Sequence, residues 1–291
     1  MRAQVRGLVK EGRLEFVNAG WSMHDEACPH YEDMINNMMA GNLFLLAEFD
    51  YKPRVGWQID PFGHSAANPR LFAEMGFDAW FFARLDYEDK DLRLKNKEME
   101  FIWRPFWDEL GERGQIFTSI LFDHYYPPNG FHVDESNQDS PIVDDPSRSN
   151  YNLEEKLELF HTAVISQSKS YKTPHILIPY GGDFWYGNAH MTFKNIDKLI
   201  KHYNAKYTDS VLFYSNPSTY VDAVQATETT WSVKYDDMLP YRDHPDAVWS
   251  GFFTSRATDK EYTRRNSANF RASQQLYSQK IFDTKLSLTE A

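Results

Sequence analysis

The sequence predicts an α/β fold, because short apolar runs with strand character alternate with longer segments of helical periodicity. A second observation is that Gly, Pro, Asn and Asp cluster between these segments, as turns require. The expected strands cover residues 14–17, 54–59, 79–83, 101–103, 115–122, 175–179 and 211–215. The expected helices cover residues 31–49, 69–75, 153–171, 193–205 and 218–224.

The strand expected at 54–59 ends in a candidate catalytic side chain. Val55, Trp57 and Ile59 alternate with smaller or polar neighbours, and the Pro and Gly of the following Asp-Pro-Phe-Gly run force the backbone out of the sheet. Asp60 therefore lies at the carboxyl end of a strand, where parallel barrels carry their active sites. Taken alone, an Asp before Pro is more often a turn or cap residue.

The remaining elements set the expected organisation. Methionines at helical spacing in residues 31–49 indicate core packing rather than a metal or cofactor site. Residues 125–148 are rich in Pro, Asn, Asp and Ser, which predicts a long surface loop. From residue 259 to 285 the pattern is polar, charged and helical without strand signals, so we expect two domains, 1–256 and 257–291.

Composition excludes several classes of function. The net charge of −11 argues against a nucleic-acid or anionic-membrane partner. No apolar run approaches the roughly 20 residues of a membrane span, and the first residues lack the apolar stretch of a secretory signal. Cys28 is the only cysteine, so no internal disulfide forms. The 16% aromatic content suits a carbohydrate site without proving one.

Two further segments carry charged side chains suited to catalysis. Arg84 follows the strand at 79–83, and a fixed cation at a strand end can orient a carboxylate, although a surface ion pair is the commoner arrangement. Asp236 and Asp237 stand side by side between aromatic residues. Two acids crowded into one pocket disfavour double ionisation, so one of them can remain protonated and act as an acid. A helix cap or an exposed acidic loop is the alternative.

In their order along the chain and in their amino-acid sequence, these segments resemble the catalytic domain of glycoside hydrolase family 38, the lysosomal-type α-mannosidases. The resemblance rests on short strings spread over most of the chain: Gly12-Arg13-Leu14-Glu15-Phe16, Gly20-Trp21, Asp25-Glu26-Ala27, Asp60-Pro61-Phe62-Gly63-His64-Ser65, Met75-Gly76-Phe77, Arg84-Leu85-Asp86-Tyr87, Gly182-Asp183-Phe184, Phe193-Lys194-Asn195, Asp236-Asp237, Trp249-Ser250-Gly251-Phe252 and Ser255-Arg256.

The resemblance implies a seven-stranded β/α barrel, here without its first strand, followed by the start of a three-helix bundle from residue 257. It implies that Asp60 is both the nucleophile and a zinc ligand, and that Asp237 is the general acid and base. The implied substrate contacts are Phe62, Arg84, Tyr125 and Asp236. Tyr126 stands where relatives usually have Asp or Asn, which puts the Tyr125 contact in doubt.

The implied chemistry is retaining hydrolysis of terminal α-mannosides in mannose-containing oligosaccharides. Such an enzyme needs two carboxyl groups roughly 5 Å apart, one attacking the anomeric carbon and one protonating the leaving oxygen. Zinc would hold sugar hydroxyls as a Lewis acid. The resemblance also implies an acidic lumen such as the lysosome, and leaves a homo-oligomer of the full-length protein open.

Zinc binding by this chain alone is not expected. The family's site takes a His-x-Asp pair on the first strand, the nucleophile and a downstream His, of which only Asp60 has a counterpart here, and one ligand cannot hold zinc. The strings His132-Val133-Asp134 and His244-Pro245-Asp246 lie in predicted loops outside the family's order. We therefore expect a fragment that is inactive alone. A metal-dependent carbohydrate deacetylase and a non-catalytic mannose-binding remnant are the alternatives.

Overall fold

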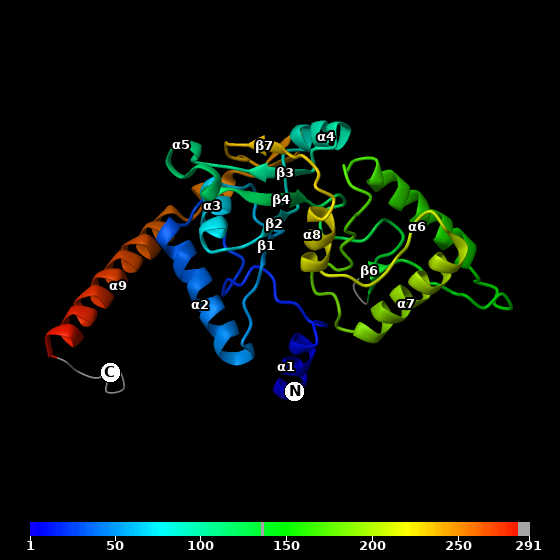
Figure 1. Cartoon of the computed structure of the whole chain (residues 1–291), viewed down its shortest axis with the longest axis horizontal. Coiled ribbons are helices and arrows are strands. Elements are labelled where there is room, and N and C mark those ends of the chain that lie inside the picture. Colours follow the sequence, from blue (N-terminus) through cyan, green and yellow to red (C-terminus); the bar gives the residue numbers. More distant parts are fainter. Residues whose placement is uncertain (135–136, 285–291) are drawn as a thin grey trace.

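A five-stranded sheet forms the centre of the computed structural model, which describes residues 1–134 and 137–284 (Figure 1). In spatial order its strands are β1 (Val55–Gln58), β2 (Ala79–Phe82), β4 (Ile116–Ile120), β3 (Glu100–Trp103) and β7 (Ser232–Lys234). Only β3 and β4 run antiparallel to each other, and the other neighbouring pairs are parallel. The fold is therefore mixed α/β, as predicted, with a mainly parallel sheet.

Apolar side chains cover both faces of this sheet. In β2, Trp80 and Phe82 belong to one buried cluster, whereas Ala79 and Phe81 belong to a second, because successive strand residues point to opposite faces. All four side chains are fully buried or nearly so. A strand buried on both faces reads as a continuous apolar run, which explains why this element was predictable from sequence.

Helices pack against both sides of the sheet. Figure 1 shows α2 and α3 on one side and α8 on the other, with α6 and α7 farther out. The helices are α1 (Arg2–Lys10), α2 (Tyr31–Phe49), α3 (Ala67–Glu74), α4 (Tyr87–Asn96), α5 (Trp107–Leu110), α6 (Leu153–Ser168), α7 (Ala189–Lys206), α8 (Pro217–Gln225) and α9 (Ala257–Thr284), with 3-10 turns at Gly111–Gly114 and Gly251–Phe253. None of these described helices is both long and apolar enough to cross a membrane.

The structure confirms four of the seven expected strands and all five expected helices to within a few residues. It adds elements that lack an apolar pattern. Helix α4 buries no side chain. Strand β7 is mostly polar and joins the sheet by pairing with β3. Within the expected loop at 125–148, β5 (Val133–Asp134) pairs antiparallel with β6 (Asn137–Gln138), and farther along the chain β8 (Arg242–His244) pairs antiparallel with β9 (Ala247–Val248). Both expected loop positions of the His-x-Asp strings were therefore partly wrong.

Three expected strands, residues 14–17, 175–179 and 211–215, are not strands in the structure. In the segments 175–179 and 211–215, side chains occupy hydrogen-bonding groups that a neighbouring strand would use. Gln167 Nε2 donates to Leu177 O at 3.0 Å, and the Asn204 side chain bonds both the N–H and the C=O of Leu212 at 2.8 and 2.7 Å. An apolar run thus predicts burial, and pairing depends on a partner that the run does not reveal. The seven-stranded barrel stays a prediction.

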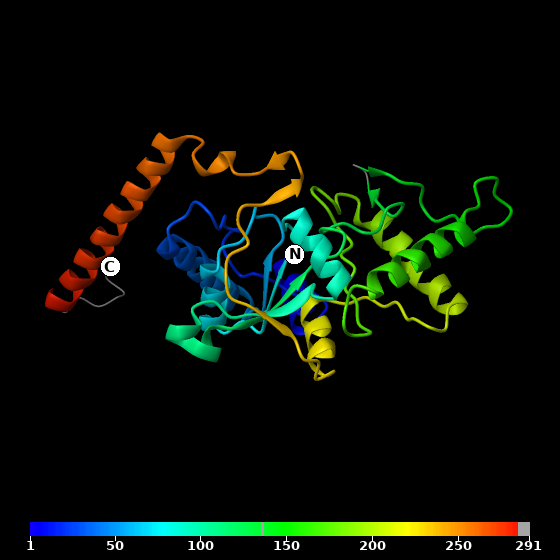
Figure 2. The same cartoon turned by 90° about the horizontal axis from the view of Figure 1, so that it is seen from above.

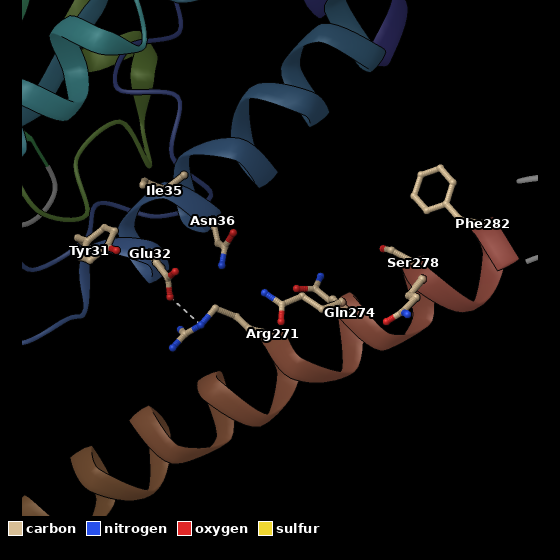
Figure 3. Close-up of a pocket in the computed structure, with 10 residues that line it drawn as sticks. Tyr31, Glu32, Ile35, Asn36, Arg271, Gln274, Ser278 and Phe282 are labelled. Atoms are coloured by element: carbon tan, nitrogen blue, oxygen red, sulfur yellow. Dashed lines mark ion pairs between the residues drawn. The ribbon is translucent and has the colours of Figure 1, made fainter.

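Helix α9 extends away from the sheet on the side opposite α6 and α7 (Figure 1 and Figure 2). It touches α2 through an ion pair between Arg271 Nε and Glu32 Oε2 at 2.6 Å. An open hollow of about 760 Å³ lies between the two helices beside this pair (Figure 3). Tyr262, Leu276 and Phe282 remain exposed along α9. The last residue of the expected 259–285 helix and residues 286–291 of the expected second domain lie outside the described residues.

A buried carboxyl group makes the stability of the fold depend on pH. Glu100 on β3 is 1% exposed and accepts hydrogen bonds from Tyr220 at 2.6 Å and Ser119 at 3.4 Å, while its Oε2 has no partner. Burial raises the pKa of Glu100 to about 7 against these two bonds. Protonation is therefore favoured in the folded chain relative to the unfolded one.

We expect Glu100→Gln to raise the free energy of unfolding, relative to the parent chain, more at pH 8 than at pH 4. The raised pKa means that the parent loses stability as pH rises from the unfolded value of 4.5 to about 7, a loss of at most about 3 kcal/mol, and the amide removes this loss. Urea denaturation at both pH values measures the difference, with exposed Glu109→Gln as control. An equal effect of Glu100→Gln at pH 4 and pH 8 would contradict the prediction.

Candidate active site

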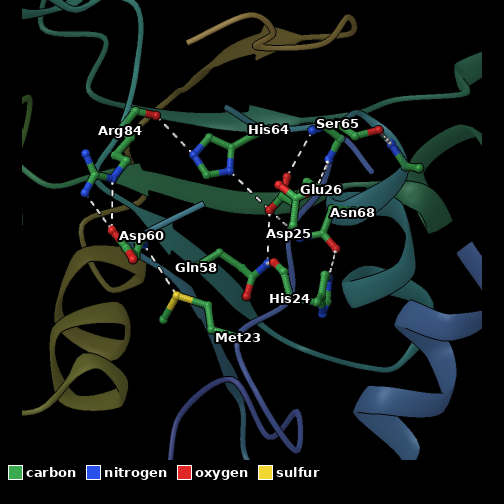
Figure 4. Close-up of polar contacts among 12 residues, drawn as sticks. Met23, His24, Asp25, Glu26, Gln58, Asp60, His64, Ser65, Asn68 and Arg84 are labelled. Carbon is green, nitrogen blue, oxygen red and sulfur yellow. Dashed lines mark hydrogen bonds and ion pairs between the residues drawn. The ribbon is translucent and has the colours of Figure 1, made fainter. Parts of the chain in front are cut away.

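The parallel pairing of β1 and β2 brings Asp60 and Arg84 to one edge of the sheet. Gln58 pairs with Phe82 at the strand ends, and each candidate residue follows its strand by two positions. Arg84 Nη2 lies 2.6 Å and Nε 3.0 Å from Asp60 Oδ1 (Figure 4). The cation at one strand end thus orients the carboxylate at the other, as the sequence suggested.

Three aromatic rings surround the Arg84 guanidinium. Its central carbon lies 5.1 Å from the ring centroid of Phe62, 5.7 Å from that of Tyr241 and 5.0 Å from that of Trp249. These distances fit cation–π contacts. Burial alone would lower the pKa of Arg84, but hydrogen bonds to Asp60 and Tyr241 outweigh it and raise the pKa. Arg84 is thus a fixed, permanent cation.

Tyr125, in the segment that follows β4, reaches the same carboxylate. Its hydroxyl lies 3.4 Å from Asp60 Oδ1. Burial is the main reason that the pKa of this phenol is raised, so the hydroxyl remains a donor at neutral pH. Tyr125 packs beside His124 and Tyr126, whose rings stack at 5.3 Å. Asp60 therefore receives hydrogen bonds on one oxygen, Oδ1, from both neighbours.

Asp237 lies beside the turn that follows Asp60. His64 and Met238 form a backbone bridge with both N···O distances at 2.9 Å. Asp237 Oδ1 accepts a short hydrogen bond from Ala66 N, at the start of α3. Backbone N–H groups at a helix start favour a negative charge. The second carboxyl oxygen of Asp237 is not part of this bond.

Asp236 points to a different partner. Its carboxylate pairs with Lys234 Nζ at 2.6 Å, and its side chain is 86% exposed. The hydrogen bond from Lys234 lowers the pKa of Asp236. The two adjacent acids are therefore not crowded into one pocket, and the sequence argument that crowding keeps one of them protonated finds no support in this arrangement.

Sequence reasoning missed a buried polar cluster beneath the Asp60 turn (Figure 4). Glu26 accepts hydrogen bonds from Gln58 Nε2, His64 Nδ1, Ser65 N and Asn68 Nδ2 at 3.2, 3.1, 2.9 and 2.8 Å. Glu26 is 4% exposed and His64 is fully buried. The available signal was that Glu26 and His64 both lie within the strings that carry the family resemblance.

The structure therefore brings most predicted site residues to one region of the sheet edge. Asp60, Arg84, Tyr125 and Phe62 are linked by the contacts above, and Asp237 adjoins them through the His64 bridge. Asp236 faces Lys234 at the surface instead. The catalytic and substrate-binding roles of these residues stay predictions.

The described residues do not make a complete zinc site. Among them, no three His, Cys, Asp or Glu side chains gather closely enough to hold a metal ion. Asp60, the one predicted ligand, is bound to Arg84 and Tyr125. The residues present thus do not fit the zinc that the family resemblance implies, and any complete site needs ligands from outside them.

Comparison with known proteins identifies the family of the chain. Residues 1–244 match the family model described as glycosyl hydrolases family 38 N-terminal domain. The chain is 45% identical to a lysosomal alpha-mannosidase of Dictyostelium discoideum, over 92% of this chain and 26% of that protein. It is 44% identical to the lysosomal alpha-mannosidase of Homo sapiens, over 89% of this chain and 26% of that protein. The chain thus spans about a quarter of the length of these relatives.

A solved structure shares the fold. It is an alpha-mannosidase from Enterococcus faecalis, with a TM-score of 0.61 and 18% identity, covering 81% of this chain and 23% of that one. The family match and the similarity to the two relatives place the chain in the glycoside hydrolase class. It belongs to glycosyl hydrolases family 38, because residues 1–244 match the model of that family's N-terminal domain.

We expect Asp237→Ala to lower the free energy of unfolding by about 1 kcal/mol, because the start of α3 loses its acceptor. Asp237→Asn keeps an oxygen that can accept from Ala66 N, so its effect is smaller. Urea denaturation measures both, with Asp236→Ala as control because that side chain lies at the surface. Equal stability of the Ala and Asn variants would show that the bond does not contribute.

Proposed function

We propose that the chain is the catalytic N-terminal part of a zinc-assisted, retaining α-mannosidase that acts on terminal mannose of oligosaccharides in an acidic lumen such as the lysosome. The observation that carries the proposal is the 2.6 Å contact between Arg84 and Asp60 at the ends of two parallel strands. The family match and the relatives named lysosomal alpha-mannosidase support it. The sheet would form part of a seven-stranded barrel, and α9 would begin the next domain.

In the proposed first step, Asp60 attacks the anomeric carbon while Asp237 gives a proton to the leaving glycosidic oxygen. Arg84 and Tyr125 bind Oδ1 of Asp60, so Oδ2 is the oxygen that attacks. In the second step Asp237 removes a proton from water, which attacks the same carbon and releases Asp60. Two inversions give net retention. Phe62, which packs on Arg84, would line the sugar site.

The described side chains do not complete a zinc site, so the steps above use protein groups only. Asp60 would be one ligand of the zinc, and other ligands would come from residues beyond the described ones. We expect the purified 291-residue chain to bind no stoichiometric zinc and to hydrolyse no aryl α-mannoside. Metal analysis and a chromogenic assay measure both. Turnover that a chelator abolishes would contradict this expectation.

A chimera tests the chain within a full-length relative, of which it spans 26%. We expect the Dictyostelium discoideum relative to remain an active α-mannosidase when this chain replaces its matching segment, which is 45% identical. An aryl α-mannoside assay measures the activity, and the unmodified relative is the control. A folded, zinc-loaded chimera without mannosidase activity would contradict the proposed function, and acetate release from acetylated sugars would indicate a deacetylase instead.

The same chimera separates the two proposed roles. Asp60→Asn removes the nucleophile and lowers kcat on every aryl α-mannoside. Asp237→Asn removes proton donation to the leaving group. We expect the rate of the first step to fall about 10²–10⁴-fold for poor leaving groups and little for dinitrophenolate, which departs without a proton. Assays of kcat/KM with both leaving groups measure the difference, because this constant reports the first step alone, before Asp237 acts as the base. Equal loss of kcat/KM on both substrates would exclude Asp237 as the acid.

A further inference from the structure

Both ring nitrogens of the buried His64 lie within hydrogen-bond distance of an oxygen atom. Its Nδ1 lies 3.1 Å from Glu26 Oε1, and its Nε2 lies 3.1 Å from the backbone oxygen of Arg84 (Figure 4). A carbonyl oxygen only accepts hydrogen bonds, and an ionised carboxylate does likewise. For both contacts to be hydrogen bonds, both ring nitrogens of His64 have to carry hydrogen, since a neutral ring would turn one lone pair towards an oxygen.

The surroundings of Glu26 favour the ionised carboxylate as the partner. Its two oxygens accept from four donors, and hydrogen bonds to the charged form of an acid stabilise that form. Both side chains of the pair are completely shielded from water. A carboxylate and an imidazolium together are neutral, which makes burial of the pair possible where either charge alone would be costly.

The pair also connects the two halves of the candidate site. Through Gln58 and Ser65, Glu26 holds the chain both before and after Asp60. His64 extends this connection to the backbone of Arg84, whose side chain binds Asp60. The His64 ring also packs against the Phe82 ring, with 4.2 Å between the two ring centroids. The buried pair thus connects the backbone on both sides of Asp60 to the backbone of Arg84, and the Arg84 side chain binds the Asp60 carboxylate.

We propose that Glu26 and His64 are positioning residues for the reaction, a carboxylate and a buried imidazolium that hold Asp60 and Arg84 at their working separation. The proposal rests on the proposed function for its consequence in catalysis, whereas the bonding of the pair is a property of this chain. Loss of the His64 bonds would free the Arg84 backbone and displace Asp60 from the line of attack, and small displacements of reacting groups are costly.

The protonation of His64 can be measured in the unmodified 291-residue chain. Nitrogen NMR of histidine-labelled protein should show two ring N–H groups for His64 at pH 7. His24 is the internal control, because its ring faces Asn68 Oδ1 at 2.8 Å and Asn37 Nδ2 at 3.2 Å, one acceptor and one donor, and so carries a single N–H. A neutral His64 ring would overturn the proposal.

The positioning role is tested in the chimera with His64→Phe, which keeps a ring against Phe82 but has no N–H. We expect kcat to fall by about tenfold or more, with KM within about threefold of the parent and zinc retained. His161→Phe is the matched control, because His161 stacks on Tyr207 at 3.9 Å in the α6–α7 part of the chain. This control should leave both constants unchanged.

A second variant, Glu26→Gln, removes the carboxylate charge with little change of shape, and we expect it to lower kcat as well. Unchanged kcat in folded His64→Phe and Glu26→Gln would overturn the proposal. If neither variant folds, the ring measurement on the parent chain decides. If the parent chimera is inactive, the proposed function fails, and the ring measurement still decides whether the pair exists.

Discussion

The buried carboxylate of Glu26 is the constraint on which the candidate site depends. It binds donors from the end of β1, from the turn after Asp60 and from α3. A charge shielded from water is tolerated only when its hydrogen-bonding capacity is filled, so these segments have to converge on it as the chain folds. The sheet alone would bring two strand ends together, whereas Glu26 fixes the turn between them.

Within the site, burial decides which partner orients the other. The side chain of Arg84 is 13% exposed and lies among aromatic rings, whereas that of Asp60 is 53% exposed. The guanidinium is thus the fixed member, and the carboxylate adapts to it. This asymmetry suits a nucleophile, because one oxygen is held by Arg84 and Tyr125 while the open side of Asp60 remains accessible to a ligand.

The parts of the structure that followed from the sequence are those with a local signal. The strand run before Asp60 and the apolar run of β2 were predictable because burial leaves a pattern of side chains. Helix α4 and strand β7 were not, because a polar helix and a polar strand are placed by their neighbours. Likewise, Asp60 and Arg84 were recognisable as strand-end residues, but the role of Glu26 emerges only when residues 38 and 42 positions away, His64 and Asn68, are brought beside it.

The division between the two adjacent acids follows from the same kind of non-local contact. Both carboxylates are exposed, but Asp236 pairs with Lys234, while the backbone bridge between His64 and Met238 places Asp237 beside the start of α3. The bridge includes His64, so the buried pair with Glu26 bears on Asp237 as well as on Arg84. A change in that pair would therefore disturb the proposed nucleophile and the proposed acid together. For that reason a buried histidine without access to substrate can influence both steps of the proposed reaction.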